Sequence, residues 1–177
     1  MALWNEKSDS LDWNLVRHGF VTKYFAPAVL TRDSAALADL GYRVITLDAS
    51  TWADEQSMHL DLAASLDFPN PFGRNLDALH EGMHDVASLG FGWEPTDTGL
   101  VLAIERFDAF ATELPHPAFA LLDTVWDAAA YGALLGNRML CLVGTSDPEW
   151  ELPKLGSRHV PWNPAESRPT ARHARAR

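Results

Sequence analysis

The chain has 177 residues and lacks several features that mark common protein classes. Its single cysteine, Cys141, excludes an internal disulfide, and its place in an apolar run predicts a buried core residue. No apolar run approaches the length that spans a bilayer. There is no Gly-rich phosphate loop and no Gly-x-Ser-x-Gly elbow, which argues against a P-loop nucleotide site and a serine-hydrolase nucleophile.

The first residues also lack the basic segment and following apolar stretch of a signal peptide. We therefore expect a cytoplasmic protein without a membrane partner. Hydrophobic residues make up 47% of the chain and charged residues 21%, which is ordinary for a globular protein in water.

Basic residues are scarce outside the C-terminal end. Residues 1–150 hold 8 Lys and Arg against 22 Asp and Glu, whereas residues 151–177 hold 6 against 2, and the net charge is −10. A strongly acidic body argues against direct nucleic-acid binding, which needs cations to neutralise phosphate. It favours a basic protein partner, although acidic surfaces also serve solubility alone.

Strand-like and helix-like stretches alternate along the chain and predict an α/β fold with a small parallel sheet. The expected core strands are residues 42–47 and the apolar runs 99–104 and 139–143, with one or two added edge strands, one of them at 20–25. About four helices are expected, at 31–40, 55–66, from Asn75 onward, and 118–135. The apolar stripe of the last helix is expected to comprise Phe119, Leu122, Trp126, Ala129 and Ala133.

This pattern divides the chain into three parts. Residues 1–41 are an N-terminal β-α extension, residues 42–150 are the central domain, and residues 151–177 are an extended arm followed by a basic tail. Pro, Arg and small residues dominate the last part, so residues 165–177 are expected to be disordered.

One segment, residues 68–83, combines a turn, a helix start and an acidic helix face. Asn75 suits the N-cap position of the helix. Asp77 and Glu81 are four residues apart, so both carboxylates project from the same helical face. The apolar residues of this helix are spaced for burial on the opposite face, and they are Leu76, Leu79, Met83 and Val86. An acidic face without a basic partner in sequence suits a cationic binding partner.

The string Gly73-Arg74-Asn75-Leu76-Asp77-Ala78-Leu79, followed by Glu81, resembles the signature of the barstar family of intracellular ribonuclease inhibitors. The order of strands and helices on both sides is also similar, over roughly residues 42–146. The resemblance implies a barstar-like parallel sheet packed with about four helices, and no catalytic activity, cofactor or metal. It implies inhibition of, or immunity against, a basic bacterial ribonuclease of the barnase type.

In that family the helix and the turn before it plug the ribonuclease active site, and the acids face the cationic groups that hold the RNA phosphate. By motif position Asp77 and Glu81 take this role, while Gly73 and Asn75 shape the loop. The other expected partner-binding residues are Phe72, His80, His84 and Val125, the last as a rim contact on the helix 118–135. The chain departs from the family pattern with Glu81 for a usual Asp, His80 for Trp and Pro71 for Tyr.

The segment His80-Glu81-Gly82-Met83-His84 also matches His-Glu-x-x-His, the helix motif of zinc proteases. Two imidazoles four residues apart can bind one zinc ion, and the glutamate between them can act as a general base. A third ligand is required, and Ala87 and Gly90 stand where the extended motif has Gly and His. A zinc hydrolase therefore stays an alternative, as does a barstar-fold module that binds a partner other than a ribonuclease.

Overall fold

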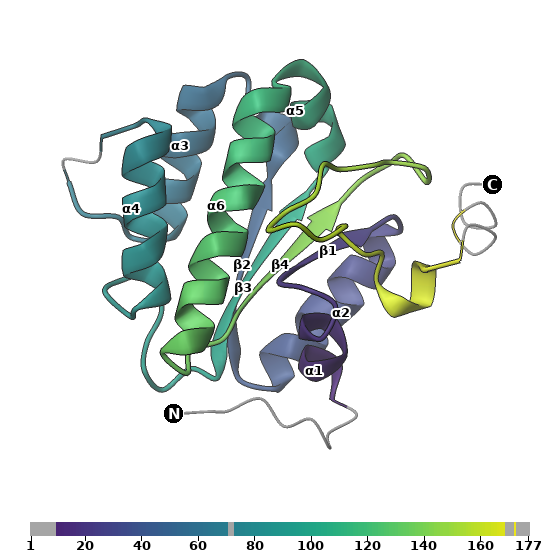
Figure 1. Cartoon of the computed structure of the whole chain (residues 1–177), viewed down its shortest axis with the longest axis horizontal. Helices are drawn as coiled ribbons and strands as arrows, with labels where there is room; N and C mark the ends of the chain where they lie inside the picture. Colours follow the sequence, from purple (N-terminus) through teal and green to yellow (C-terminus); the bar gives the residue numbers. More distant parts are fainter. Residues whose placement is uncertain (1–9, 71–72, 169–171, 173–177) are drawn as a thin grey trace.

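The computed structural model describes residues 10–70, 73–168 and 172, and its centre is a four-stranded parallel sheet (Figure 1). The strands are β1 (Val21–Tyr24), β2 (Tyr42–Asp48), β3 (Gly99–Glu105) and β4 (Met139–Gly144), in the order β1-β4-β3-β2. Val101 of β3 aligns with Val44 of β2 on one side and with Leu140 of β4 on the other. The expected parallel sheet is confirmed, and of the one or two expected edge strands the described residues form one, β1.

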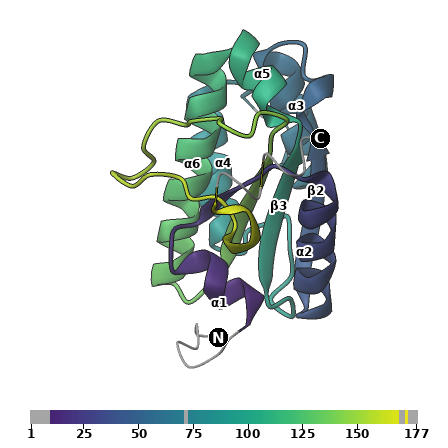
Figure 2. The ribbon, with the colours of Figure 1, turned by 90° about the vertical axis from the view of Figure 1, so that its right-hand side faces the viewer.

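Helices cover both faces of this sheet (Figure 2). One face carries α1 (Leu11–Val16) and α2 (Pro27–Asp39), and the other carries α3 (Glu55–Ser65), α4 (Leu76–Ala87), α5 (Phe107–Glu113) and α6 (Pro115–Leu134). Alternate residues of β3 serve the two layers, since Leu102 packs in the α3–α6 core and Val101 in the α2 core. A sheet buried on both faces explains why β3 and β4 read as continuous apolar runs.

Two helices begin earlier than the sequence pattern predicts, and both have proline in the first turn. α2 starts at Pro27 instead of residue 31, and α6 starts at Pro115 instead of residue 118. Proline is favoured there because its fixed φ suits a helix and its missing N–H would have no helical partner. The short helices α1 and α5 are additional to those expected.

The C-terminal segment packs along β1 (Figure 1). Lys23 N donates to Pro161 O at 2.8 Å, and Asn163 N donates to Lys23 O at 2.9 Å, which pairs this arm with the outer edge of β1. Glu166 and Arg172 are 0% and 4% exposed. The expectation of disorder from residue 165 onward is therefore wrong for residues 165–168 and for Arg172, because side chains in this segment find partners in the body of the protein.

Cys141 lies in β4 and is fully buried, and this burial raises the pKa of its thiol to about 12. Its expected place in the core is confirmed. Within the described ranges, no helix has both the length and the apolar character that crossing a membrane requires.

Candidate functional site

The turn before α4 is held by contacts within its own sequence motif. Asn75 Oδ1 accepts a hydrogen bond from Ala78 N at 2.8 Å, which is the N-cap that the sequence predicts. Gly73 lies against the first helical turn, where a Cβ would stand 2.9 Å from Ala78 Cβ. Arg74, between them, has a left-handed φ of 38°. Gly73 and Asn75 thus shape the start of α4, whereas Phe72 lies outside the described residues.

The inner face of α4 is anchored in the core. Leu79, Met83 and Val86 are fully buried, as their spacing predicts. Gly82 faces Phe68, whose ring fills the space that a Cβ would need. This close packing sets the rotation of the helix about its axis, and so it determines which residues face outward.

The outer face of α4 presents Asp77 and Glu81, both exposed. Among the residues that the structure describes, neither carboxylate takes part in an ion pair or a side-chain hydrogen bond. Asp77 stands in the first turn, where the positive end of the helix dipole favours a negative charge. The result is a pair of unpartnered carboxylates, one helical turn apart, on open surface.

α6 runs beside α4 and extends this surface (Figure 1). Asp127 Oδ2 lies 2.8 Å from His84 Nε2 and 3.3 Å from His80 Nε2. Asp123, one turn earlier on α6, lines a groove of about 390 Å³ together with His80 and Asp127. We call the surface made by these α6 residues and the outer side of α4 the acidic face; its members are Asp77, His80, Glu81, His84, Asp123 and Asp127.

The sequence prediction for α6 is confirmed at Leu122 and Ala129, which are buried, and is wrong at Val125. Val125 is 1% exposed and packs in the core, so it cannot provide the expected rim contact. The expected stripe residues Phe119 and Trp126 are only partly buried. The stripe that the structure buries comprises Ala118, Leu121, Leu122, Val125, Ala128, Ala129 and Gly132. A signal for the outward side was present, because Asp123 and Asp127 repeat the four-residue spacing of the acids on α4.

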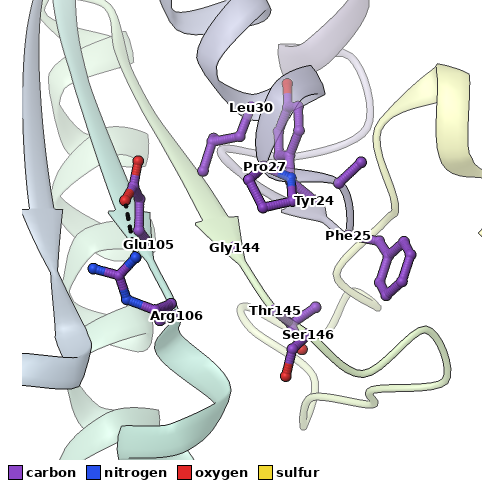
Figure 3. A pocket seen from close by; sticks show the side chains of 10 residues that line it. Tyr24, Phe25, Pro27, Leu30, Glu105, Arg106, Gly144, Thr145 and Ser146 are labelled. Atoms are coloured by element: carbon purple, nitrogen blue, oxygen red, sulfur yellow. Dashed lines mark ion pairs between the residues drawn. The ribbon is translucent and has the colours of Figure 1, made fainter. Parts of the chain in front are cut away.

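A separate cavity of about 270 Å³ lies at the carboxyl ends of β1, β3 and β4 (Figure 3). Ligands of parallel sheets often bind at such edges. Here the polar groups already have partners. Arg106 pairs with Glu105 at 3.6 Å and with Asp48, and its hydrogen bond to Asp48 lowers the pKa of that carboxyl. Ser146 Oγ donates to Asp108 Oδ2 at 2.6 Å. The acidic face, whose two α4 carboxylates have no partner among the described residues, is the better candidate for recognition.

The central part of the chain is similar to known proteins. Residues 42–143 match the family described as "Barstar (barnase inhibitor)", and this span contains both α4 and α6. The chain is also similar to the protein named "Putative ribonuclease inhibitor YrdF" from Bacillus subtilis (strain 168). The identity is 33% over 86 residues, which are 49% of this chain and 85% of that protein.

Proposed function

The chain belongs to the barstar family, and from this premise we propose that it inhibits a basic bacterial ribonuclease of the barnase type. The family and the name of the Bacillus subtilis relative support a role as a ribonuclease inhibitor. Such a protein acts by binding and needs no catalytic step of its own. We propose in addition which class of ribonuclease is the target and which residues of this chain contact it.

The acidic face carries this proposal. A ribonuclease active site holds the RNA phosphate with cationic side chains, and a carboxylate can accept paired hydrogen bonds from arginine much as phosphate does. Asp77 and Glu81 are exposed and have no partner of their own within the described ranges, so they are free to take such bonds. Docking this face onto the active site would exclude RNA by occupying the phosphate position.

The surroundings of the two acids support a preformed binding surface. α4 is held by the buried side chains Leu79 and Met83, and its first turn is capped by Asn75. Carboxylates on a helix fixed in this way lose little freedom when they bind, which favours affinity. His80 and His84 lie on the same side as Glu81, and we propose that they border the contact.

We further propose that residues 42–150 are the binding domain, and that residues 1–41 are an addition that does not meet the ribonuclease. α2 covers the sheet face opposite to α4 and α6, and the C-terminal arm follows the outer edge of β1 (Figure 2). α2 thus lies away from the acidic face, whereas Gly156 of the C-terminal segment lines its groove together with His80, Asp123 and Asp127. We place the protein in the bacterial cytoplasm, where an inhibitor protects cellular RNA.

The direct test is RNA cleavage by a barnase-type ribonuclease in the presence of the purified chain. We expect complete inhibition at one equivalent and a 1:1 complex on gel filtration. Asp39→Ala is the matched control, because Asp39 is an exposed acid at the end of α2 on the opposite layer, and it should inhibit like the wild type. Failure to inhibit any member of a panel of basic bacterial ribonucleases would contradict the proposal and favour a different partner.

A further inference from the structure

We propose that His80, His84 and Asp127 bind one divalent transition-metal ion, with Zn²⁺ as the first candidate, on the acidic face between α4 and α6. The three side chains offer two imidazole nitrogens and one carboxylate oxygen, and these ligand atoms all lie within 4.8 Å of one another. Imidazole and carboxylate together form a common ligand set for Zn²⁺.

The separations fit the edges of a small coordination polyhedron. Ligands placed tetrahedrally at about 2.0–2.1 Å from a zinc ion lie roughly 3.3–3.4 Å from one another. Asp127 Oδ2 is 3.3 Å from His80 Nε2 and 2.8 Å from His84 Nε2. Asp127 Oδ2 therefore already lies near both imidazole nitrogens, and the side chains have to rotate out of their present hydrogen-bonded arrangement to admit an ion.

The frame that carries these ligands is rigid. His80 and His84 are one turn apart on α4, whose inner side is buried, and Asp127 is on α6, which packs directly against α4. The His84 ring stacks on His80 with centroids 4.6 Å apart and on Tyr131 with centroids 4.8 Å apart. Ligands held in place by packing bind a metal more tightly than ligands on mobile loops.

The site is open to solvent. The exposed fractions of the side chains are 51% for His80, 30% for His84 and 52% for Asp127. Three protein ligands leave at least one coordination position for water or for a group from another molecule. We therefore expect an exchangeable ion, and we assign binding to these residues without any hydrolytic step.

The sequence motif contains two of the ligands and gives no sign of the third. Asp127 follows His84 by 43 residues, and it comes close because α6 packs beside α4. The expectation that the chain holds no metal rested partly on the lack of a third ligand, and the fold supplies one.

An ion at this position would also change the charge of the acidic face. Glu81 directly follows His80, so a divalent cation would offset much of the negative charge around it. If this face binds a basic ribonuclease, occupancy by zinc should weaken that complex. This consequence rests on the proposed function, whereas metal binding itself is measured on the free chain.

The test uses the full chain, made without a histidine tag and treated with a chelator. Zn²⁺ is titrated in competition with a chromophoric chelator, and Co²⁺ is added separately because its visible absorption reports the ligand set. We expect one Zn²⁺ per chain, with affinity at least about tenfold weaker in His84→Ala and Asp127→Asn. His116→Ala is the matched control, because His116 is an exposed histidine in the first turn of α6.

Equal Zn²⁺ affinity in the wild-type and His84→Ala chains would overturn the assignment, as would a comparable loss in His116→Ala. The lack of saturable binding would also overturn it, and the three residues would then form a hydrogen-bonded cluster only. Because no ribonuclease is present, these outcomes separate failure of the metal site from failure of the proposed inhibition.

Discussion

The acidic residues on the two sides of the sheet share one chemistry and differ in their surroundings. Around β1 and α2, the residues Asp12, Asp33 and Glu166 are at most 6% exposed, and the carboxylate of each accepts hydrogen bonds. On α4, Asp77 and Glu81 are exposed and lack such partners among the described residues. The first group stabilises the fold, whereas the second group is available to bind another molecule.

Glu166 illustrates the buried group. Its carboxylate accepts hydrogen bonds from Phe25 N at 3.0 Å and from Ala26 N at 2.9 Å, and Asn163 Nδ2 also donates to it. Ala26 is the N-cap residue of α2 and has no side chain that could cap the helix. The C-terminal arm therefore supplies, from far along the chain, the acceptor that the start of α2 lacks.

Asp12 and Asp33 hold two buried tyrosines in a similar way. Tyr42 Oη donates to Asp12 at 2.8 Å, and Tyr24 Oη donates to Asp33 at 3.1 Å. Burial of a carboxylate is costly unless it is hydrogen-bonded, so complete pairing is what a structural role requires. Exposed carboxylates contribute little to folding, and we propose that those of α4 serve recognition instead.

The largest effect on stability is expected from removing the Glu166 carboxylate. Glu166→Ala should lower the free energy of unfolding by about 2–6 kcal/mol, because two backbone donors lose their acceptor at about 1–3 kcal/mol each. Urea denaturation followed by circular dichroism measures this change. Glu81→Ala removes an acid from the other side of the sheet and should leave stability nearly unchanged. An equal loss of unfolding free energy in the two variants would contradict the distinction between buried structural acids and exposed acids.

The free energy of unfolding should fall at alkaline pH because of two buried tyrosines, Tyr24 and Tyr42, in the core around α2. Burial, aided by Asp33, raises the pKa of Tyr24, and burial with the hydrogen bond to Asp12 raises the pKa of Tyr42, in both cases above the usual 10.0. The unfolded phenols ionise first, so the stability that these groups contribute is present below about pH 10 and is lost as the pH rises further. At one pH unit above the unfolded pKa the loss is about 1.4 kcal/mol per tyrosine.

This loss is measured as the difference in unfolding free energy between pH 9 and pH 11. Tyr24→Phe and Tyr42→Phe should each reduce the loss of unfolding free energy between these two pH values. Tyr131→Phe, a change at an exposed ring on α6, should not reduce it. Burial lowers the pKa of Lys23, which makes stability rise with pH in the same range, so the variants must be compared with the wild type. An unchanged fall in Tyr24→Phe and Tyr42→Phe would contradict the assignment.

A smaller effect is expected from salt, and it concerns the rate at which the acidic face associates with a ribonuclease. Opposite charges on the acidic face and a basic ribonuclease accelerate their encounter, and salt screens this attraction. The association rate constant, measured by stopped flow, should fall by about tenfold between low and physiological salt, with less change in dissociation. An association rate that does not depend on salt would mean that the acids lie outside the contact.

The sequence predicts the parts of the fold that depend on local pattern. The strands β3 and β4 read as apolar runs because both faces of the sheet are covered. The buried side of α4 follows from the spacing of Leu79, Met83 and Val86, and Asn75 is the expected N-cap. These predictions succeed because the residues that decide them lie within a few positions of one another.

The features that the sequence does not predict depend on distant contacts. α6 is apolar on most sides, so its composition leaves the rotation of the helix open, and packing turns Val125 inward and Asp127 toward α4. The segment after residue 164 has the composition of a solvated tail, yet Glu166 and Arg172 are buried by groups that precede them by many residues. The burial of Glu166 and Arg172 has no short-range signature, whereas the outward side of α6 has one in the four-residue spacing of Asp123 and Asp127.

The assignment of the two sides is tested most directly by titrating a barnase-type ribonuclease with Asp77→Ala and Glu81→Ala chains, with a thermal melt of each free variant. We predict that each substitution weakens binding by about 2–5 kcal/mol, the general cost of truncating one partner of a buried, hydrogen-bonded charge pair. The melting temperature should stay unchanged or rise slightly, because acids four residues apart repel each other by a few tenths of a kcal/mol. Variants that bind like the wild type would contradict the role of the acidic face.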